Sequence, residues 1–200
     1  MIQADLPFTY SYALYLRPMK PLTLLNGKQL DLTLNRLAIQ LIEVHGGFED
    51  SAIIGIQRTG ALFSKALIEK IKILRPGIDP LHGLLDVTFF RDDFGRRGKP
   101  LQAFSTELDF AVEGKNIVLV DDVLFTGRTI RAAMDALMSL GRPAHVELMV
   151  LIDRRFSRQL PIEPTYTGKR VDSIASQHVD VKWYEKGFKE AILYDKNLDT

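Results

Sequence analysis

Two adjacent carboxylates, Asp121 and Asp122, stand directly after the four apolar residues 117–120. Residues 123–129, which include one glycine and two threonines, then lead into a helix-like pattern. The free N–H groups and the dipole at a helix start favour an anion, and glycine allows its close approach. Paired carboxylates accept hydrogen bonds from a vicinal diol or bind Mg²⁺ through water. Together these residues predict a site for a phosphate beside a diol, as in a ribose 5-phosphate.

Two other interpretations of the acidic pair remain open. Receiver domains use such a pair to hold magnesium and to accept a phosphoryl group, but there it follows the first strand, whereas here several elements precede it. The pair could also simply cap the following turn. The glycine patterns of dinucleotide-binding folds and of P-loop proteins are absent from this sequence.

The elements around the pair predict an α/β fold with a mostly parallel sheet. Residues 52–56 and 117–120 are apolar without alternation, which is typical of strands covered on both faces. Each precedes a short glycine-bearing loop and a helix, the first helix reaching about Ile71. Residues 81–90 and 146–152 predict further strands, the latter ending in Asp153-Arg154-Arg155. Ligands of such sheets bind at the carboxyl ends of the strands, where Asp121 and Asp122 lie.

Helical spacing predicts which residues these helices bury. An amphipathic helix is expected over residues 28–45, with Leu30, Leu34, Leu37, Leu41 and Ile42 on its apolar face. The buried faces of the other two helices are expected to hold Leu62, Ala66, Leu67 and Ile71, and Ile130, Met134, Leu137 and Met138.

The remaining segments are less regular. Residues 1–18 are interpreted as an N-terminal extension and residues 19–200 as one domain. The charged, glycine-bearing stretch that starts at Arg91 predicts a mobile loop, about 91–107. Short strands are expected around Ile174, at 179–183 and at 191–194.

Composition excludes several classes of function. The chain of 200 residues has no cysteine, so thiolate catalysis and cysteine-ligated metal sites are impossible. Its net charge is only +1, so the composition gives no electrostatic argument for nucleic-acid binding. No apolar run approaches the roughly 20 residues of a membrane span, and the start lacks a signal-peptide pattern. We therefore expect a cytoplasmic protein without a membrane partner.

The segment 118–130, Val-Leu-Val-Asp-Asp-Val-Leu-Phe-Thr-Gly-Arg-Thr-Ile, resembles the phosphoribosyl-pyrophosphate (PRPP) signature of type I phosphoribosyltransferases. Within that family, residues 131–137, 141–143, 86–93 and 153–169 resemble the subgroup of bifunctional pyrimidine-operon regulators and uracil phosphoribosyltransferases. The resemblance covers about residues 20–195. It implies the α/β fold described above plus a small hood subdomain, mainly in residues 155–200.

The resemblance also implies roles for individual residues. Asp121 and Asp122 would bind the ribose hydroxyls and, with Arg91 of the flexible loop, would be the catalytic residues. The full PRPP-binding set would be Asp121, Asp122, Val123, Leu124, Phe125, Thr126, Gly127, Arg128 and Thr129. Gln57, Arg58, Thr59 and Gly60 would form the pyrophosphate loop, although the subgroup often has Thr-Arg-Gly there, so the Arg58-Thr59 order is a departure. Asp153 and Arg154 lie where the family forms its base pocket, or else form a salt-bridged strand end.

The implied reaction converts uracil and PRPP to UMP and pyrophosphate, with Mg²⁺ bound through PRPP and possible contacts from Asp121 and Asp122. A second hypothesis is a UMP-responsive regulator that binds pyrimidine leader mRNA and keeps the site only as a sensor. A third keeps the enzyme and replaces uracil by a purine or orotate. The family forms dimers and larger assemblies, so a homo-oligomer is expected.

Overall fold

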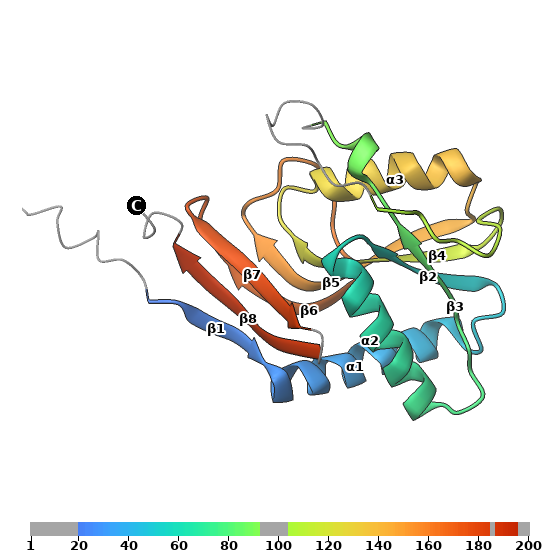
Figure 1. The fold of residues 1–200 in the computed structure, drawn as a ribbon, viewed down its shortest axis with the longest axis horizontal. Coiled ribbons are helices and arrows are strands. Elements are labelled where there is room, and N and C mark those ends of the chain that lie inside the picture. The colour runs from blue at the N-terminus through green and yellow to red at the C-terminus, as the bar shows by residue number, and fades with distance from the viewer. Residues whose placement is uncertain (1–19, 93–103, 185–186, 196–200) are drawn as a thin grey trace, which may run out of the picture.

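The structure is a computed structural model that describes residues 20–92, 104–184 and 187–195. Its main sheet has five parallel strands in the order β3-β2-β4-β5-β6 (Figure 1). Their bounds are β2 Ser51–Ile56, β3 Leu81–Leu85, β4 Asn116–Leu124, β5 His145–Arg155 and β6 Tyr166–Asp172. The predicted α/β fold with a parallel sheet is confirmed.

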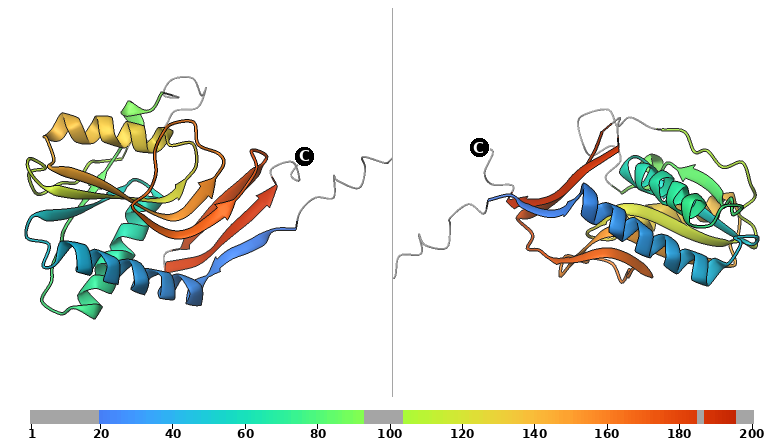
Figure 2. Two further views of the ribbon diagram at one scale, coloured as in Figure 1. Left: turned by 180° about the vertical axis from the view of Figure 1, so that it is seen from behind. Right: turned by 90° about the horizontal axis from the view of Figure 1, so that it is seen from below.

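Helices cover both faces of this sheet. Helices α1 (Gly27–His45) and α2 (Thr59–Leu74) lie on one face and α3 (Arg128–Leu140) lies on the other, as the views in Figures 1 and 2 agree. Consecutive strand residues join different cores: Val118 packs with the α1 and α2 side, and Leu119 with the α3 side. A strand buried on both faces needs apolar residues at every position, which explains the uninterrupted runs in the sequence.

A smaller antiparallel sheet lies beside the main one. It has the order β1-β8-β7, from β1 Leu22–Asn26, β7 Gln177–Tyr184 and β8 Gly187–Asp195. The expected hood range of 155–200 differs from this sheet at both ends, because β6 pairs with β5 in the main sheet and β1 comes from the start of the described chain.

The predicted strand over residues 81–90 was too long. β3 ends at Leu85, and Thr88–Phe90 forms a 3₁₀ turn. The Asp86 carboxylate accepts hydrogen bonds from the Thr88 N–H at 2.9 Å and the Thr88 hydroxyl at 2.6 Å, which bends the chain out of the sheet. Phe89, which falls within the strand expected from the sequence, lies in this turn and is 67% exposed.

Other sequence predictions differ in detail. Leu62 and Met138 are exposed. In α3 the predicted Ile130 and Leu137 are buried, and Ala132, Ala133 and Ala136 are buried with them. The strand expected around Ile174 is β6, which ends at Asp172, and Ile174 lies exposed in the turn before β7. The extension 1–18 and residues 93–103 of the expected loop fall outside the described residues.

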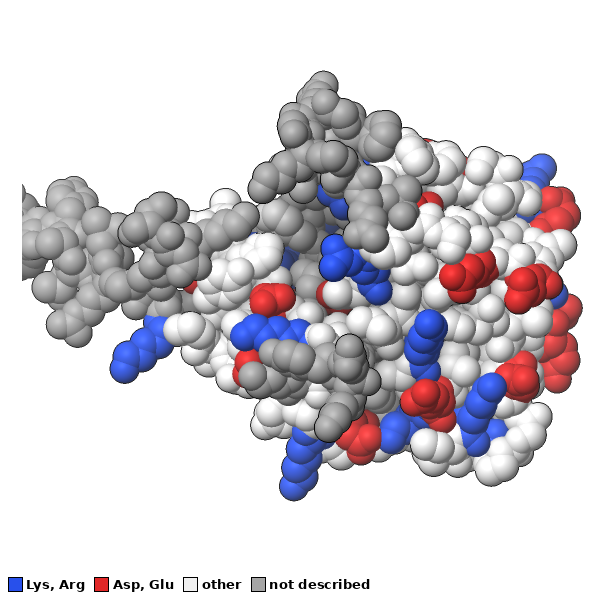
Figure 3. Space-filling model, in the orientation of Figure 1, with Lys and Arg blue, Asp and Glu red and all other residues white. Residues whose placement is uncertain are grey.

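The face of the molecule seen in Figure 3 carries charges of both signs. Lysine and arginine side chains are interspersed with aspartate and glutamate over the face seen in Figure 3. Among the described helices, none is long and apolar enough to cross a membrane.

Candidate active site

The topology creates a crevice at the carboxyl ends of β2 and β4. The connection from β2 passes through α2 on one face of the sheet, while the connection from β4 passes through α3 on the other. Pairing of β4 with β2 ends at Val120, whereas pairing with β5 continues to Leu124. The end of β4 therefore projects beside an opening where β2 has turned away, which is the usual position of a ligand in such sheets.

Asp121 and Asp122 lie in this projecting end. They belong to β4, at whose carboxyl end the sequence placed them, and the strand runs on to Leu124, further than the expected end, because the β5 neighbour carries the ladder past them. Asp121 is buried, and one of its carboxylate oxygens accepts a 2.9 Å hydrogen bond from the Asp122 N–H. The Thr59 hydroxyl donates to the Asp122 carboxylate. Two strands and one helix start thus fix the acidic pair.

Burial dominates the electrostatics of this pair. It raises the pKa of Asp121 well above its ordinary value, and the neighbouring Asp122 charge raises it further, while Arg91 acts in the opposite direction. Burial also raises the pKa of Asp122, against the hydrogen bond from Thr59. Two apposed carboxylates with raised pKa values favour a ligand that brings hydroxyl donors or a cation.

The loop Gln57-Arg58-Thr59-Gly60 packs tightly on the same strand. A Cβ at Gly60 would lie 2.6 Å from the Val120 carbonyl oxygen and 3.0 Å from Asp121 Cα, so only glycine lets α2 begin this close to β4. The Gln57–Arg58 peptide bond is cis, and α2 begins without a side-chain cap. Its first N–H groups therefore face the crevice without a side-chain acceptor.

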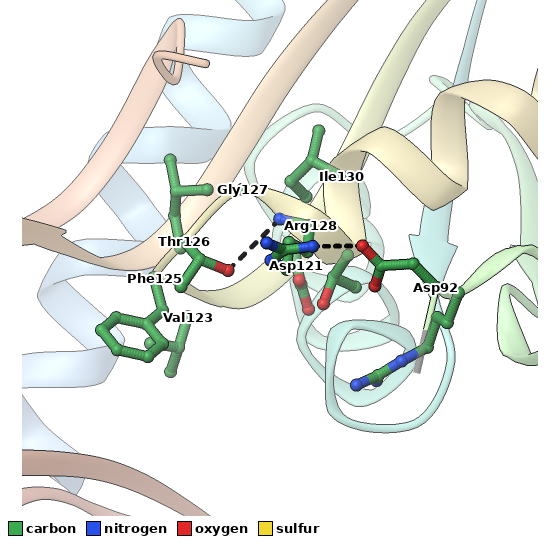
Figure 4. A pocket seen from close by; sticks show the side chains of 11 residues that line it. Asp92, Asp121, Val123, Phe125, Thr126, Gly127, Arg128 and Ile130 are labelled. Carbon is green, nitrogen blue, oxygen red and sulfur yellow. Dashed lines mark hydrogen bonds and ion pairs between the residues drawn. The ribbon is translucent and has the colours of Figure 1, made fainter. Parts of the chain in front are cut away.

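A cavity of about 500 Å³ lies beside the loop after β4 and is lined by residues 123–130, Arg91, Asp92 and Asp121 (Figure 4). Gly127 adopts a left-handed conformation with φ of 90°, and α3 starts there without a side-chain cap. A glycine is required at this φ. The cavity thus places the start of α3, where the Arg128 N–H donates a 3.4 Å hydrogen bond to the Thr126 hydroxyl, beside the hydroxyl of Thr129, which is the arrangement predicted for an anion.

Arg128 spans the mouth of this cavity. Its guanidinium forms an ion pair with Asp92 and donates a 2.8 Å hydrogen bond to Gln159, as Figure 4 shows for Asp92. Arg91, the predicted catalytic residue of the loop, lines both this cavity and the adjoining one of about 460 Å³. That second cavity also contains Gln57, Arg58, Thr59, Asp121 and Asp122, so the predicted PRPP loop and pyrophosphate loop share one crevice.

Asp153 and Arg154, the predicted base pocket, have partners of their own. Arg154 is 2% exposed and donates to the Ser173 hydroxyl at 2.9 Å and to the Gln177 carbonyl at 2.8 Å. Its guanidinium lies 3.9 Å from the centre of the Phe125 ring. Asp153 forms an ion pair with Arg158. These contacts match the salt-bridged strand end, while Arg154 also supports Phe125 of the PRPP loop.

Sequence reasoning missed the residues that support the site from outside. Arg158 bonds the Leu124 carbonyl at 3.2 Å and the Ile162 carbonyl at 3.0 Å in addition to Asp153. The sequence did not single out Arg158, because two of its partners are backbone carbonyls and one of these, Leu124, lies 34 residues away. Asp86 was missed as well, because nothing in the sequence assigned a role to this residue of the segment 86–93.

The donor set fits Mg²⁺ only through a ligand. Within the described residues, no group of three histidine or acidic side chains could hold a metal ion. Two carboxylates alone leave most of the six Mg²⁺ positions to water and phosphate oxygens, which is how Mg²⁺ commonly binds with phosphate substrates.

A comparison with protein families identifies this arrangement. The phosphoribosyl transferase domain matches residues 22–186. The chain belongs to the phosphoribosyltransferase family. Bifunctional protein PyrR from Acetivibrio thermocellus is 47% identical over 152 residues, covering 76% of this chain and 82% of that protein. Bifunctional protein PyrR from Elusimicrobium minutum is 39% identical over 175 residues, covering 87% and 97%.

Solved phosphoribosyltransferase structures share the fold. A hypoxanthine phosphoribosyltransferase from Staphylococcus aureus superposes with a TM-score of 0.67 at 18% identity, covering 96% of this chain and 99% of that one. A Trypanosoma cruzi hypoxanthine phosphoribosyltransferase gives 0.67 at 14% identity, covering 89% and 97%. The type I phosphoribosyltransferase fold predicted from the PRPP signature is confirmed, as is the resemblance to the PyrR subgroup.

Proposed function

We propose that this phosphoribosyltransferase converts uracil and PRPP to UMP and pyrophosphate. The observation that carries the proposal is the Asp121–Asp122 pair, with Asp121 buried and Asp122 partly exposed, set between two helix starts that lack side-chain caps. Such a crevice suits a ligand with a diol between two phosphate groups, as PRPP has. The PyrR resemblance selects uracil among the bases.

Each part of the crevice has a role in this proposal. Asp121 and Asp122 accept hydrogen bonds from the ribose 2- and 3-hydroxyls. Residues 126–129 hold the 5-phosphate at the start of α3, and residues 57–60 hold the pyrophosphate at the start of α2. Arg91 lies between the two cavities, where it balances the charge of the leaving pyrophosphate. Mg²⁺ would be bound by PRPP, with Asp121 and Asp122 as its nearest protein carboxylates, and would neutralise pyrophosphate charge.

The chemistry requires little acid–base catalysis. The bond from the anomeric carbon to pyrophosphate breaks ahead of most bond formation to the uracil nitrogen, so the rate depends on positioning, charge stabilisation and exclusion of water. The base would lie beside Phe125, and Asp153 and Arg154 would shape its pocket through the backbone and through the contact of Arg154 with Phe125.

The direct test combines Asp122→Asn with Thr126→Ala and measures UMP formation. We expect the activity to be lost while the circular dichroism spectrum and cooperative melting remain, because both side chains face the crevice. Near-normal turnover would reject the assignment. Assays of uracil, hypoxanthine, guanine and orotate with PRPP decide which base is used.

A second function is favoured by the names of the relatives, which are called bifunctional. We propose that the chain also binds pyrimidine leader mRNA in response to UMP, as a homo-oligomer. Filter binding of that RNA with and without UMP tests this role. Binding that is absent or independent of UMP would contradict it, and it would leave the enzymatic proposal untouched.

A further inference from the structure

We propose that Asp86 is a positioning residue for the pyrophosphate loop and acts on it through Phe104. This inference rests on the proposed function, because residues 57–60 are assigned to pyrophosphate there. Asp86 lies at the end of β3 and does not line either active-site cavity, although its neighbours Val87 and Thr88 line one of them. Any effect of Asp86 on the substrate must therefore pass through other residues.

The Asp86 carboxylate joins two stretches that are far apart in sequence. One oxygen accepts the two bonds from Thr88, and the other accepts a 2.8 Å hydrogen bond from the Phe104 N–H. The Asp86 N–H donates to the Thr106 hydroxyl at 3.2 Å. Asp86 thus satisfies donors both where the chain leaves β3 and where it comes back 18 residues later.

The return segment, residues 104–108, is held flat against β3. Leu84 and Glu107 exchange two backbone hydrogen bonds of 2.8 Å, as in an antiparallel bridge. A Cβ at Gly83 would lie 2.1 Å from Leu108 Cδ2, so glycine makes room for this packing. The bridge fixes residues 107 and 108, and Asp86 fixes the Phe104 end.

Phe104 passes this restraint on to the pyrophosphate loop. Its ring lies 5.7 Å from the Arg58 guanidinium, and the neighbouring Ser105 carbonyl accepts a 3.5 Å hydrogen bond from the Gln57 side chain. Phe104, Gln57 and Arg58 line the cavity that contains the acidic pair. An arginine held against an aromatic ring loses fewer conformations when it binds an anion, since it is already ordered.

The test is Asp86→Asn, with binding of PRPP and of UMP measured separately by calorimetry. Asparagine keeps one oxygen for Thr88 but presents an amide in place of the oxygen that accepts from Phe104. We expect PRPP and free pyrophosphate to bind about tenfold more weakly, the scale of one hydrogen bond to a charged group. Affinity for UMP, which has no pyrophosphate, should be unchanged. An equal loss for PRPP and UMP would overturn the inference.

Two further variants make the result decisive. Asp109→Asn changes an exposed carboxylate just beyond the return segment and should leave all three affinities as in the wild type. Phe104→Leu keeps the N–H that Asp86 binds but removes the ring, so it should reproduce the selective loss, and Asp86→Asn should add little to it. If the losses of PRPP affinity caused by Asp86→Asn and Phe104→Leu add up in the double variant, Asp86 does not act through Phe104. If Asp86→Asn does not fold, normal PRPP binding by Phe104→Leu alone refutes it.

The outcomes also separate this inference from the proposed function. If the wild-type chain binds no PRPP and forms no UMP, the assignment of the site fails. If the wild type is active but Asp86→Asn changes the affinities for PRPP and UMP equally, or changes neither, only the positioning role fails.

Discussion

Replacing Asp121 by asparagine should make the protein more stable while it removes the activity. Asp121 is buried beside a second carboxylate, and both effects raise its pKa. Asparagine has the same shape, and its side-chain oxygen can still accept the hydrogen bond from the Asp122 N–H. The substitution therefore removes a buried like charge without opening a cavity.

The pH dependence follows from the direction of the shift. An aspartate with a raised folded pKa binds more protons in the folded than in the unfolded protein, so stability falls as pH rises from the unfolded value, about 3.9, through the folded one. Asp121→Asn lacks this loss. Its advantage over the wild type should be near zero below about pH 4 and should grow toward neutral pH.

The size of the gain is bounded. Each pKa unit by which the folded carboxyl exceeds its unfolded value costs the wild type about 1.4 kcal/mol once the pH is above both values. Arg91 and the Asp122 N–H offset part of this cost. We expect a gain of roughly 1–3 kcal/mol at pH 7, which raises the melting temperature by about 2–4 °C per kcal/mol in a chain of this size.

Thermal and urea unfolding at pH 4 and pH 7, without ligand, measure this difference. The matched control is Asp135→Asn, which changes an exposed aspartate 3.7 Å from Arg131 on α3 and should alter stability by less than about 0.5 kcal/mol. Equal stability of Asp121→Asn and the wild type at pH 7 would refute the reasoning. A gain of the same size at pH 4 would show that charge is not its cause.

Two further substitutions test the packing around the site. Gly60→Ala places a methyl group 2.6 Å from the Val120 carbonyl oxygen, so α2 must shift away from β4. We expect the unfolding free energy, measured by urea titration, to fall by about 1–3 kcal/mol, and kcat/KM for PRPP, measured by UMP formation, to fall strongly. A KM for PRPP equal to that of the wild type would contradict the close approach. Arg158→Ala removes the ion-pair partner in direct contact with the 5% exposed Asp153 and leaves Arg170, whose Nε lies 3.8 Å from the carboxylate, so we expect a loss of at most about 3–5 kcal/mol by urea unfolding. Arg155→Ala breaks an exposed pair with Asp172 and should cost much less than Arg158→Ala, because water screens exposed charges; equal costs for the two variants would argue against a buried pair.

The parts of the fold that sequence predicted are those with a strong local signal. Residues 52–56 and 117–120 are apolar at every position because helices cover both faces of β2 and β4. A short apolar run of this kind is typical of a strand that is buried on both faces. The PRPP signature then located the site, since glycine and hydroxyl residues at a helix start have few other uses together. β1 was missed, because five residues paired with a strand at the far end of the chain carry no local signal.

Side-chain contacts that hydrophobic patterns do not reveal explain what the sequence did not show. The strand from Leu81 was extended too far because its end depends on two local hydrogen bonds, which the Thr88 N–H and hydroxyl donate to the Asp86 carboxylate. The base-pocket role of Asp153 and Arg154 stays a prediction, but the sequence did not show their partners: Arg154 bonds to Ser173 and Gln177, and Asp153 pairs with Arg158. Charged residues at a strand end show that partners must exist, and only the folded chain shows which ones.

The extension of β4 through the acidic pair explains how the protein holds two carboxylates that repel each other. Beyond Val120 the strand has lost β2 as a neighbour, which opens the crevice, but it remains hydrogen-bonded to β5 as far as Leu124. A free loop could relieve the repulsion by turning one carboxylate toward water, whereas a paired strand cannot move without breaking its ladder. The stability cost predicted for Asp121 therefore follows from the same feature that presents both carboxylates to the ligand.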